Sequence, residues 1–190
     1  MKAKRLLALV LAAMVFALAG CVDQHPDTQE DTDADTENPR LVATSPAVAQ
    51  ICNRLELDLV GVCQTSGTLP ERYQDLPKVG LAMNPDLEIL KSLEPDYILS
   101  PNSLESDLQP KYASIGVKSL FLNLKSVDGM YAAIEGLGKK FHREQQAQAM
   151  LDEFDAFMAE YRTKNAGKDS PRSQSSSKFD FTDFFQIKGE

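Results

Sequence analysis

The sequence predicts an α/β fold, in which a mostly parallel four-stranded sheet is followed by one long helix. Two observations support this. Short apolar and β-branched runs alternate with helical patterns from Arg40 onward, and the last pattern keeps apolar residues at helical spacing for about six turns. Strands that alternate with helices form a parallel sheet that helices cover on both faces. The hydrophobic content of 43% is enough for such a core.

Local signals place the first elements. The first helix is predicted over 45–55, because Ser45 is a good N-cap and Pro46 suits the first helical position. A polar loop, 64–78, follows the second strand. The four predicted strands are RLVAT, LDLVGVC, PDYILS and VKSLFLNL, at 40–44, 57–63, 95–100 and 117–124.

Further helices follow the polar loop. One is predicted over 84–93, with Asn84 as its N-cap and Pro85 as its first helical residue. Acidic residues in its first turn favour the positive end of the helix dipole. Ser126 is predicted to cap a later helix. The remaining helices are expected around 110–115, at 126–141 and, as the long final helix, at 143–164.

The N-terminal segment 1–20 is predicted to be a lipoprotein signal peptide, which takes no part in the fold. Its apolar run is too short for a bilayer span, which takes about 20 apolar residues. The run ends in Leu-Ala-Gly-Cys, which resembles the lipobox of bacterial lipoproteins. Cys21 would then carry acyl chains that hold the protein on the extracytoplasmic face of the cell membrane. The alternative is a plain secretory signal with a coincidental cysteine.

An acidic, disordered tether is predicted over 21–38. It has no Lys or Arg and almost no apolar residues, so it cannot bury enough surface to offset the entropy of ordering. Like charges extend such a segment. A metal-buffering role is the alternative, although the acids follow no regular spacing. The acidic residues are Asp23, Asp27, Glu30, Asp31, Asp33, Asp35 and Glu37.

A binding rim is predicted where the parallel strands end, because ligands of open α/β sheets bind outside the carboxyl ends of the strands. The loop that carries Met83 belongs to the same rim. Its thioether is either a contact for a ligand or a gap-filling side chain. The strand ends are Thr44-Ser45, Cys63 to Ser66, Ser100-Pro101 and Leu124-Lys125.

Two loops carry a resemblance to a known family. The LP-x-RY loop at 69–73 and the M-x-PDLE loop at 83–88 are similar to those of periplasmic-type binding proteins for iron chelates, haem and cobalamin. Within that family the match is to haem-binding lipoproteins of the iron-regulated surface determinant type. The resemblance implies that 39–165 form the Rossmann-like N-terminal lobe, ending in the connector helix that joins it to a second lobe.

The resemblance also implies roles for residues. Met83 would be an axial ligand of haem iron, opposite a histidine from the second lobe, and haem would be the transported ligand. Tyr73 would either stack on the porphyrin edge or simply cover its loop. Implied partners are an ABC permease and its ATPase, cell-surface haem donors and the lipid membrane. The expected pocket and propionate contacts are Thr44, Ser45, Pro46, Thr65, Ser66, Tyr73 and Ser100.

Other residues suggest no separate site. His25 in the tether and His142 between two helices are expected to be solvated. Cys52 and Cys63 form either a disulfide, which an exported chain permits, or two buried thiols. The chain shows no nucleophile–base pattern and no phosphate loop, so an enzyme is not expected, although chelatases share a related architecture. The net charge of −8 argues against nucleic-acid binding, which needs a basic stripe.

The C-terminal stretch 166–190 departs from the family. A second lobe should open there with an apolar strand, but a polar, serine-rich sequence follows instead. We expect a disordered tail that arose by truncation or frameshift, with the second lobe absent; a natural one-lobe variant is the alternative. The open functional alternatives are a siderophore or corrinoid carrier and a non-functional single lobe.

Overall fold

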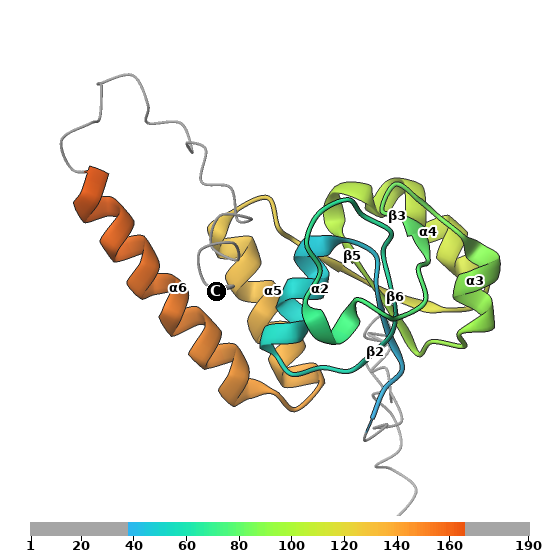
Figure 1. The fold of residues 1–190 in the computed structure, drawn as a ribbon, viewed down its shortest axis with the longest axis horizontal. Helices are drawn as coiled ribbons and strands as arrows, with labels where there is room; N and C mark the ends of the chain where they lie inside the picture. The colour runs from blue at the N-terminus through green and yellow to red at the C-terminus, as the bar shows by residue number, and fades with distance from the viewer. Residues whose placement is uncertain (1–37, 166–190) are drawn as a thin grey trace, which may run out of the picture. The chain divides into compact units, whose positions relative to one another are not determined.

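The computed structural model describes residues 38–165, and its centre is a four-stranded sheet (Figure 1). The strand order is β2-β1-β5-β6, and every neighbouring pair is parallel. This confirms the predicted α/β fold and its parallel sheet, although each strand is shorter than the sequence run that predicted it. The strands are β1 (Leu41–Ala43), β2 (Leu59–Val62), β5 (Tyr97–Pro101) and β6 (Lys118–Leu122).

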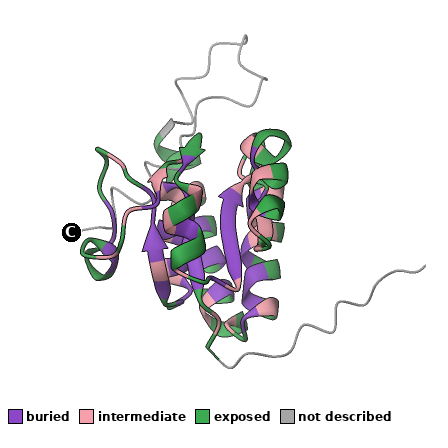
Figure 2. Cartoon of the chain, turned by 90° about the vertical axis from the view of Figure 1, so that its right-hand side faces the viewer, coloured by how far each residue is buried: buried purple, intermediate pink, exposed green. Residues whose placement is uncertain are grey.

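Helices cover both faces of the sheet, and β1, β2 and β5 lie mostly buried between the two layers, whereas the edge strand β6 is largely half-buried (Figure 2). Leu41 and Ala43 point to one face, where the core includes side chains of α2, α5 and α6. Val42, between them, points to the other face and packs with Leu90 of α3 and with α4. Because successive side chains of β1 point to opposite faces of the sheet, the strand contributes residues to both hydrophobic cores. The helices are α2 (Pro46–Arg54), α3 (Leu87–Ser92), α4 (Glu105–Ser114), α5 (Val127–Lys140) and α6 (Glu144–Asn165), with short 3-10 turns η2 (Glu71–Tyr73) and η3 (Asn102–Leu104).

Both serine caps predicted from the sequence are confirmed. The Ser45 hydroxyl accepts from the Val48 amide at 3.3 Å, and the Ser126 hydroxyl accepts from the Gly129 amide at 3.1 Å. Each satisfies one of the amides that the first turn leaves without a helical partner. Both helices consequently begin just after a strand, at the carboxyl end of the sheet.

The predicted start of α3 is wrong. Asn84 does not cap the helix and Pro85 is not its first residue; the two form strand β4 (Asn84–Pro85), which pairs antiparallel with β3 (Gly80–Leu81). The true N-cap is Asp86, whose carboxylate accepts from the amides of Glu88 and Ile89 at 3.0 and 3.1 Å. Asp is as good an N-cap as Asn, so pairing with β3 decides which residue caps.

Helix α4 is longer than predicted. The sequence predicts a helical piece around 110–115. Instead α4 begins at Glu105 and includes Pro110 in its interior. Leu108 and Tyr112 lie on either side of the proline and are fully buried. Their burial in the second core compensates for the helical hydrogen bond that proline removes.

The long final helix packs against the lobe over only its first half. Its buried side chains on that half are Ala147, Met150, Leu151 and Phe154. Phe157 and Met158 are half-buried, and Tyr161 is 44% exposed. Figure 1 shows the later turns of α6 extending away from α5. Among the described helices, none is both long enough and apolar enough to cross a bilayer.

Candidate ligand-binding rim

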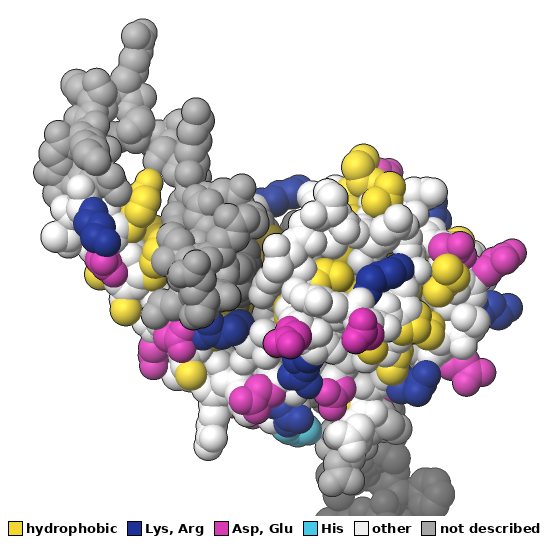
Figure 3. Space-filling model, in the orientation of Figure 1, with side chains coloured by type: hydrophobic (Ala, Val, Ile, Leu, Met, Phe, Trp, Pro, Cys, Tyr) yellow, Lys and Arg dark blue, Asp and Glu magenta, His cyan; other side chains and the backbone are white. Residues whose placement is uncertain are grey.

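Met83 lies at the tip of a tight hairpin. Gly80 pairs with Pro85 and Leu81 with Asn84, which leaves Ala82 and Met83 as the turn. The Met83 side chain is 75% exposed, more than any other large hydrophobic side chain in the described part of the chain, and Leu81 follows at 58%. Figure 3 shows hydrophobic side chains projecting at the upper edge of the lobe. The turn thus presents a thioether to solvent, outside both hydrophobic cores.

Backbone hydrogen bonds attach this hairpin to the end of β2. Val62 accepts from the Val79 amide at 2.9 Å and donates to the carbonyl of Pro77 at 3.0 Å. One step further along, the Gln64 amide donates to the Gly80 carbonyl at 2.7 Å. The chain from Pro77 therefore continues the sheet beyond β2 and turns into the hairpin at the carboxyl end of that strand. The predicted position of Met83 on the rim is consistent with this geometry.

Gly80 sets the direction of the hairpin. Its φ of +89° lies in the left-handed region, which side chains with a Cβ rarely adopt. A Cβ here would lie 3.0 Å from the Asp86 nitrogen and 3.1 Å from the Asn84 oxygen. The hairpin and the start of α3 are therefore folded closely against Gly80.

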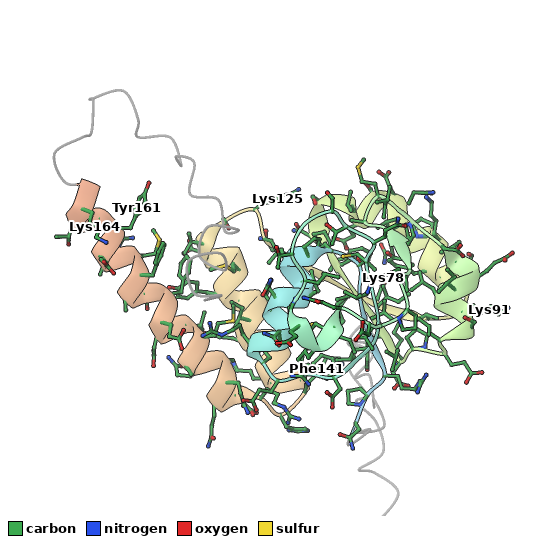
Figure 4. The ribbon with its side chains drawn as sticks, viewed as in Figure 1. Lys78, Lys91, Lys125, Phe141, Tyr161 and Lys164 are labelled. Carbon is green, nitrogen blue, oxygen red and sulfur yellow. The ribbon has the colours of Figure 1, made fainter. Side chains whose placement is uncertain are left out.

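Lys78 ties the long loop to the base of the hairpin, and the sequence analysis missed it. Its ammonium donates to the carbonyls of Tyr73, Gln74 and Leu76 at 3.3, 2.6 and 2.9 Å. Figure 4 labels Lys78 within the lobe, beside the loop. Three donors on one compact head group suit three converging carbonyls. The sequence pattern could not predict these contacts, because the carbonyls that Lys78 binds belong to an irregular turn.

Thr44 and Ser100 meet beneath the rim. Their hydroxyls are 2.7 Å apart, the Thr44 hydroxyl donates to the Leu99 carbonyl at 3.2 Å, and the Ser100 hydroxyl is 3.2 Å from that of Tyr112. All three side chains are fully buried, and burial raises the pKa of the Tyr112 phenol. The expectation that Thr44 and Ser100 contact a ligand is therefore wrong, because both are fully buried and their hydroxyls bond within the protein, beneath the rim.

The remaining predicted contacts lie along the same edge. Ser45 caps α2 and Pro46 is its first helical residue. Thr65 is half-buried and its hydroxyl accepts from the Gly67 amide at 3.0 Å, and Ser66 is exposed. These residues follow β1 and β2, so the topology brings them to the edge that carries the hairpin.

Tyr73 does not belong to this rim. Its side chain is 2% exposed and packs in the core, and its hydroxyl donates to the carbonyl of Leu57. The expectation that its ring stacks on a ligand is therefore wrong, and its alternative role of covering the loop fits the structure. Burial raises the pKa of the Tyr73 phenol. Tyr73 lies in a polar loop of the sequence, and nothing in the local pattern indicates that its side chain is buried.

Lys125 is the only cation on the described rim loops, 44–46, 63–67, 80–86, 100–104 and 123–126. It is exposed, in the loop between β6 and α5, and its side chain extends outward (Figure 4). It lies at a predicted strand end, Leu124-Lys125, for which no ligand contact was predicted. A lone cation just after an apolar strand is the sequence feature that could have identified Lys125 as a candidate ligand contact.

Among residues 38–165, those outside the rim form no second cluster of metal-binding side chains. His142 is exposed and follows α5, a helix that starts at the carboxyl edge and runs back, so it lies at the opposite end of the sheet. Cys52 and Cys63 are free, buried thiols, which agrees with the second of the two predicted alternatives. Within residues 38–165, no three His, Cys, Asp or Glu side chains cluster as a metal site would require. Cys21, His25 and the tail 166–190 lie outside the described residues.

Comparison with protein families assigns the chain to a family: the model for the periplasmic binding protein family matches residues 41–176. The chain belongs to the periplasmic binding protein family. The match includes the sheet, the hairpin and the whole of α6. This agrees with the family resemblance carried by the two loops.

Individual relatives in this family are similar over about half of their own length. The high-affinity heme uptake system protein IsdE of Staphylococcus aureus is 32% identical over 157 residues, which are 83% of this chain and 52% of that protein. The structure of S. aureus IsdE complexed with heme matches with a TM-score of 0.63 at 31% identity, over 72% of this chain and 51% of that one. An ABC transporter substrate-binding protein from Listeria monocytogenes matches with a TM-score of 0.66 at 35% identity, over 70% and 51%.

Proposed function

We propose that this chain is the haem-binding lobe of a substrate-binding lipoprotein of an ABC importer, held by acylated Cys21 on the extracytoplasmic face of the membrane. The observation that carries the proposal is the Met83 thioether, 75% exposed at the tip of a hairpin that the backbone attaches to the ligand-binding edge of the sheet. A large apolar side chain held in solvent by a tight turn is suited to contact a ligand.

The chemistry of the hairpin suits an iron porphyrin. A thioether is a neutral, soft donor that holds haem iron in some haem proteins. Covering Met83 and Leu81 with a flat apolar ring would stabilise the complex by less than the roughly 1.5–3 kcal/mol that complete burial of each side chain contributes. Lys125, the cation on the described rim, would pair with a haem propionate. The first turn of α2, after Ser45, offers a backbone amide and the positive end of a helix dipole to the other propionate.

The proposed partners follow from the functions of the relatives and from the length of the match. The chain spans about half the length of the curated relatives it matches, so a second lobe would supply the opposite face of the site and a histidine for the other axial position. An ABC permease with its ATPase would receive haem from the two lobes, and cell-surface haem proteins would supply it. In this proposal the chain binds and delivers haem but does not transform it.

Ligand competition tests the proposal. The purified chain is titrated with haem, iron-free protoporphyrin, a ferric hydroxamate siderophore and cobalamin, and binding is followed by absorbance and by change in melting temperature. Haem should bind most tightly, and protoporphyrin more weakly, because it lacks the metal that the thioether holds. Tighter binding of the siderophore or cobalamin would overturn the assignment in favour of the corresponding carrier.

A further inference from the structure

The edge of the sheet formed by β6 lies beside an apolar groove. β6 is the last strand in the order β2-β1-β5-β6, so one side of its backbone has no neighbouring strand among the described residues. A groove of about 440 Å³ lies between this strand and α5. Its lining includes Leu120 and Leu122 of β6 and Ala133, Gly136, Leu137 and Lys140 of α5, and it reaches Asn123 at the end of the strand.

Small residues on α5 keep the groove open. A Cβ added at Gly136 would meet no other atom within 4 Å, so there is free space directly above the helix. Ala133, one turn earlier, adds only a methyl group. An exposed sheet edge flanked by apolar surface invites an extended segment, because an added strand pairs with the edge while alternate side chains fill the groove.

The same chain contains a segment with matching chemistry. Residues 179–187 read FDFTDFFQI, with four phenylalanines and an isoleucine in an otherwise polar tail. Apolar residues recur at every second position in Phe179, Phe181, Phe185 and Ile187, with Asp183 as the one interruption. Aromatic and β-branched residues at period two favour a strand. The acidic residues of this segment also complement the positive charge of Lys140 in the groove.

The intervening stretch is long enough for the segment to reach the groove. Residues 166–178 span up to roughly 45 Å when extended, at about 3.5 Å per residue. The 22 residues of α6 are shorter, at about 33 Å. A short linker also gives a tethered segment an effective concentration in the millimolar range. Modest apolar burial therefore suffices for docking within one chain.

We infer that residues 179–187 dock in the groove between β6 and α5, extended along the edge of β6. The segment covers the backbone groups of this edge and buries its phenylalanines over Gly136 and Leu137. This inference does not depend on haem binding by Met83. It replaces, for residues 179–187, the expectation of disorder for the whole of 166–190.

Tryptophan fluorescence tests this docking, because the chain has no native tryptophan. In the full chain, Phe181→Trp should emit at a shorter wavelength than the control Ser175→Trp, which lies in the polar linker. Adding Gly136→Leu should fill the groove and shift the Phe181→Trp emission back to that of the control. Leucine favours helix more than glycine does, so this variant should still fold, as circular dichroism will check.

Three outcomes would overturn the inference. Equal emission from the Phe181→Trp and Ser175→Trp chains would mean that the segment stays in solvent. A blue shift that disappears on hundredfold dilution would mean that a second copy of the chain provides the contact. A blue shift that Gly136→Leu leaves intact would place the segment elsewhere. Amide exchange is the second measurement: Phe181→Asp with Phe185→Asp should speed exchange in β6 but not in β1.

Discussion

The backbone amide of Asp86 donates to the carbonyl of Val79 at 2.8 Å, and this hydrogen bond closes the base of the hairpin that carries Met83. Asp86 also caps α3 with its carboxylate. One residue therefore joins the hairpin to the helix behind it. The exposed turn is held at its base by this bond and by the left-handed backbone of Gly80.

Replacing Gly80 with alanine should lower the free energy of unfolding by about 1–3 kcal/mol, because the residue must keep a positive φ against close backbone contacts. Urea denaturation measures the loss. The control is Gly67→Ala, where a Cβ would lie at an ordinary 3.4 Å from the Thr65 hydroxyl oxygen and φ is not left-handed. Equal stability of the two variants would contradict the role given to Gly80.

The two buried thiols give a prediction for pH dependence. Burial is the main cause that raises the pKa of Cys52 from 9.0 to about 12 and that of Cys63 from 9.0 to about 11. Above pH 9 the thiols ionise in the unfolded chain but remain protonated in the folded chain. Their contribution is therefore fully present below pH 9 and is lost as pH rises through 11 to 12. At pH 10.5, about one and a half units above the unfolded pKa, the loss should amount to roughly 2 kcal/mol per thiol.

Urea denaturation between pH 7.5 and 10.5 measures this loss. The chain with Cys52→Ala and Cys63→Ala should be less stable at neutral pH, but its stability should decline less steeply above pH 9. A thiol reagent should label neither cysteine in the folded protein and both after unfolding. Rapid labelling of the folded chain, or identical pH profiles for the two proteins, would show that the thiols are not buried as described.

The features predicted correctly from the sequence depend on neighbouring residues. Ser45 and Ser126 could be identified as caps because a serine before a helical pattern bonds to an amide only three residues away. The four parallel strands could be identified from short apolar runs, and their order is consistent with the alternation of strands and helices. The predicted ligand edge follows from that topology and required no knowledge of individual contacts.

The features that were missed depend on residues distant in sequence. Asn84 and Asp86 are equally good caps, and only the pairing of 80–81 with 84–85 makes Asp86 the cap. Tyr73 packs in the core, where its hydroxyl donates to the carbonyl of Leu57, sixteen residues earlier. Lys78 binds three carbonyls of an irregular turn. No local pattern contains such contacts, so the sequence placed Met83 near the rim but described its loop as the start of a helix.

Membrane anchoring is tested at Cys21, in the N-terminal part of the chain. Cys21→Ala should leave the protein without lipid and, if the signal is still cleaved, should release it into the soluble fraction. Metabolic labelling with a fatty-acid analogue and cell fractionation measure both effects. Cys52→Ala, at a buried position, is the matched control and should remain membrane-bound. A Cys21→Ala variant that stays wholly with the membrane would exclude the lipobox.

The later turns of α6 should exchange their amide hydrogens much faster than the first turns. Burial ends at Phe154 and Tyr161 is 44% exposed, so the end of the helix gains little from packing. Hydrogen-exchange mass spectrometry should show protection up to about Phe154 and fast exchange beyond Tyr161. The buried turns of α5 around Ile134 provide the protected reference. Strong protection as far as Asn165 would mean that the end of α6 is packed after all.

The most direct test of the account is haem titration of the chain and of Met83→Leu, which keeps the size of the side chain but removes the sulfur. The variant should bind haem about tenfold more weakly or worse, which is ~1.4 kcal/mol, and should lose the absorbance features of thioether ligation. Leu81→Ala, in the same hairpin, should lose apolar contact but keep the spectrum. Met83→His should bind more tightly, with an imidazole spectrum. Identical spectra and affinities for the wild-type chain and Met83→Leu would contradict ligation by Met83.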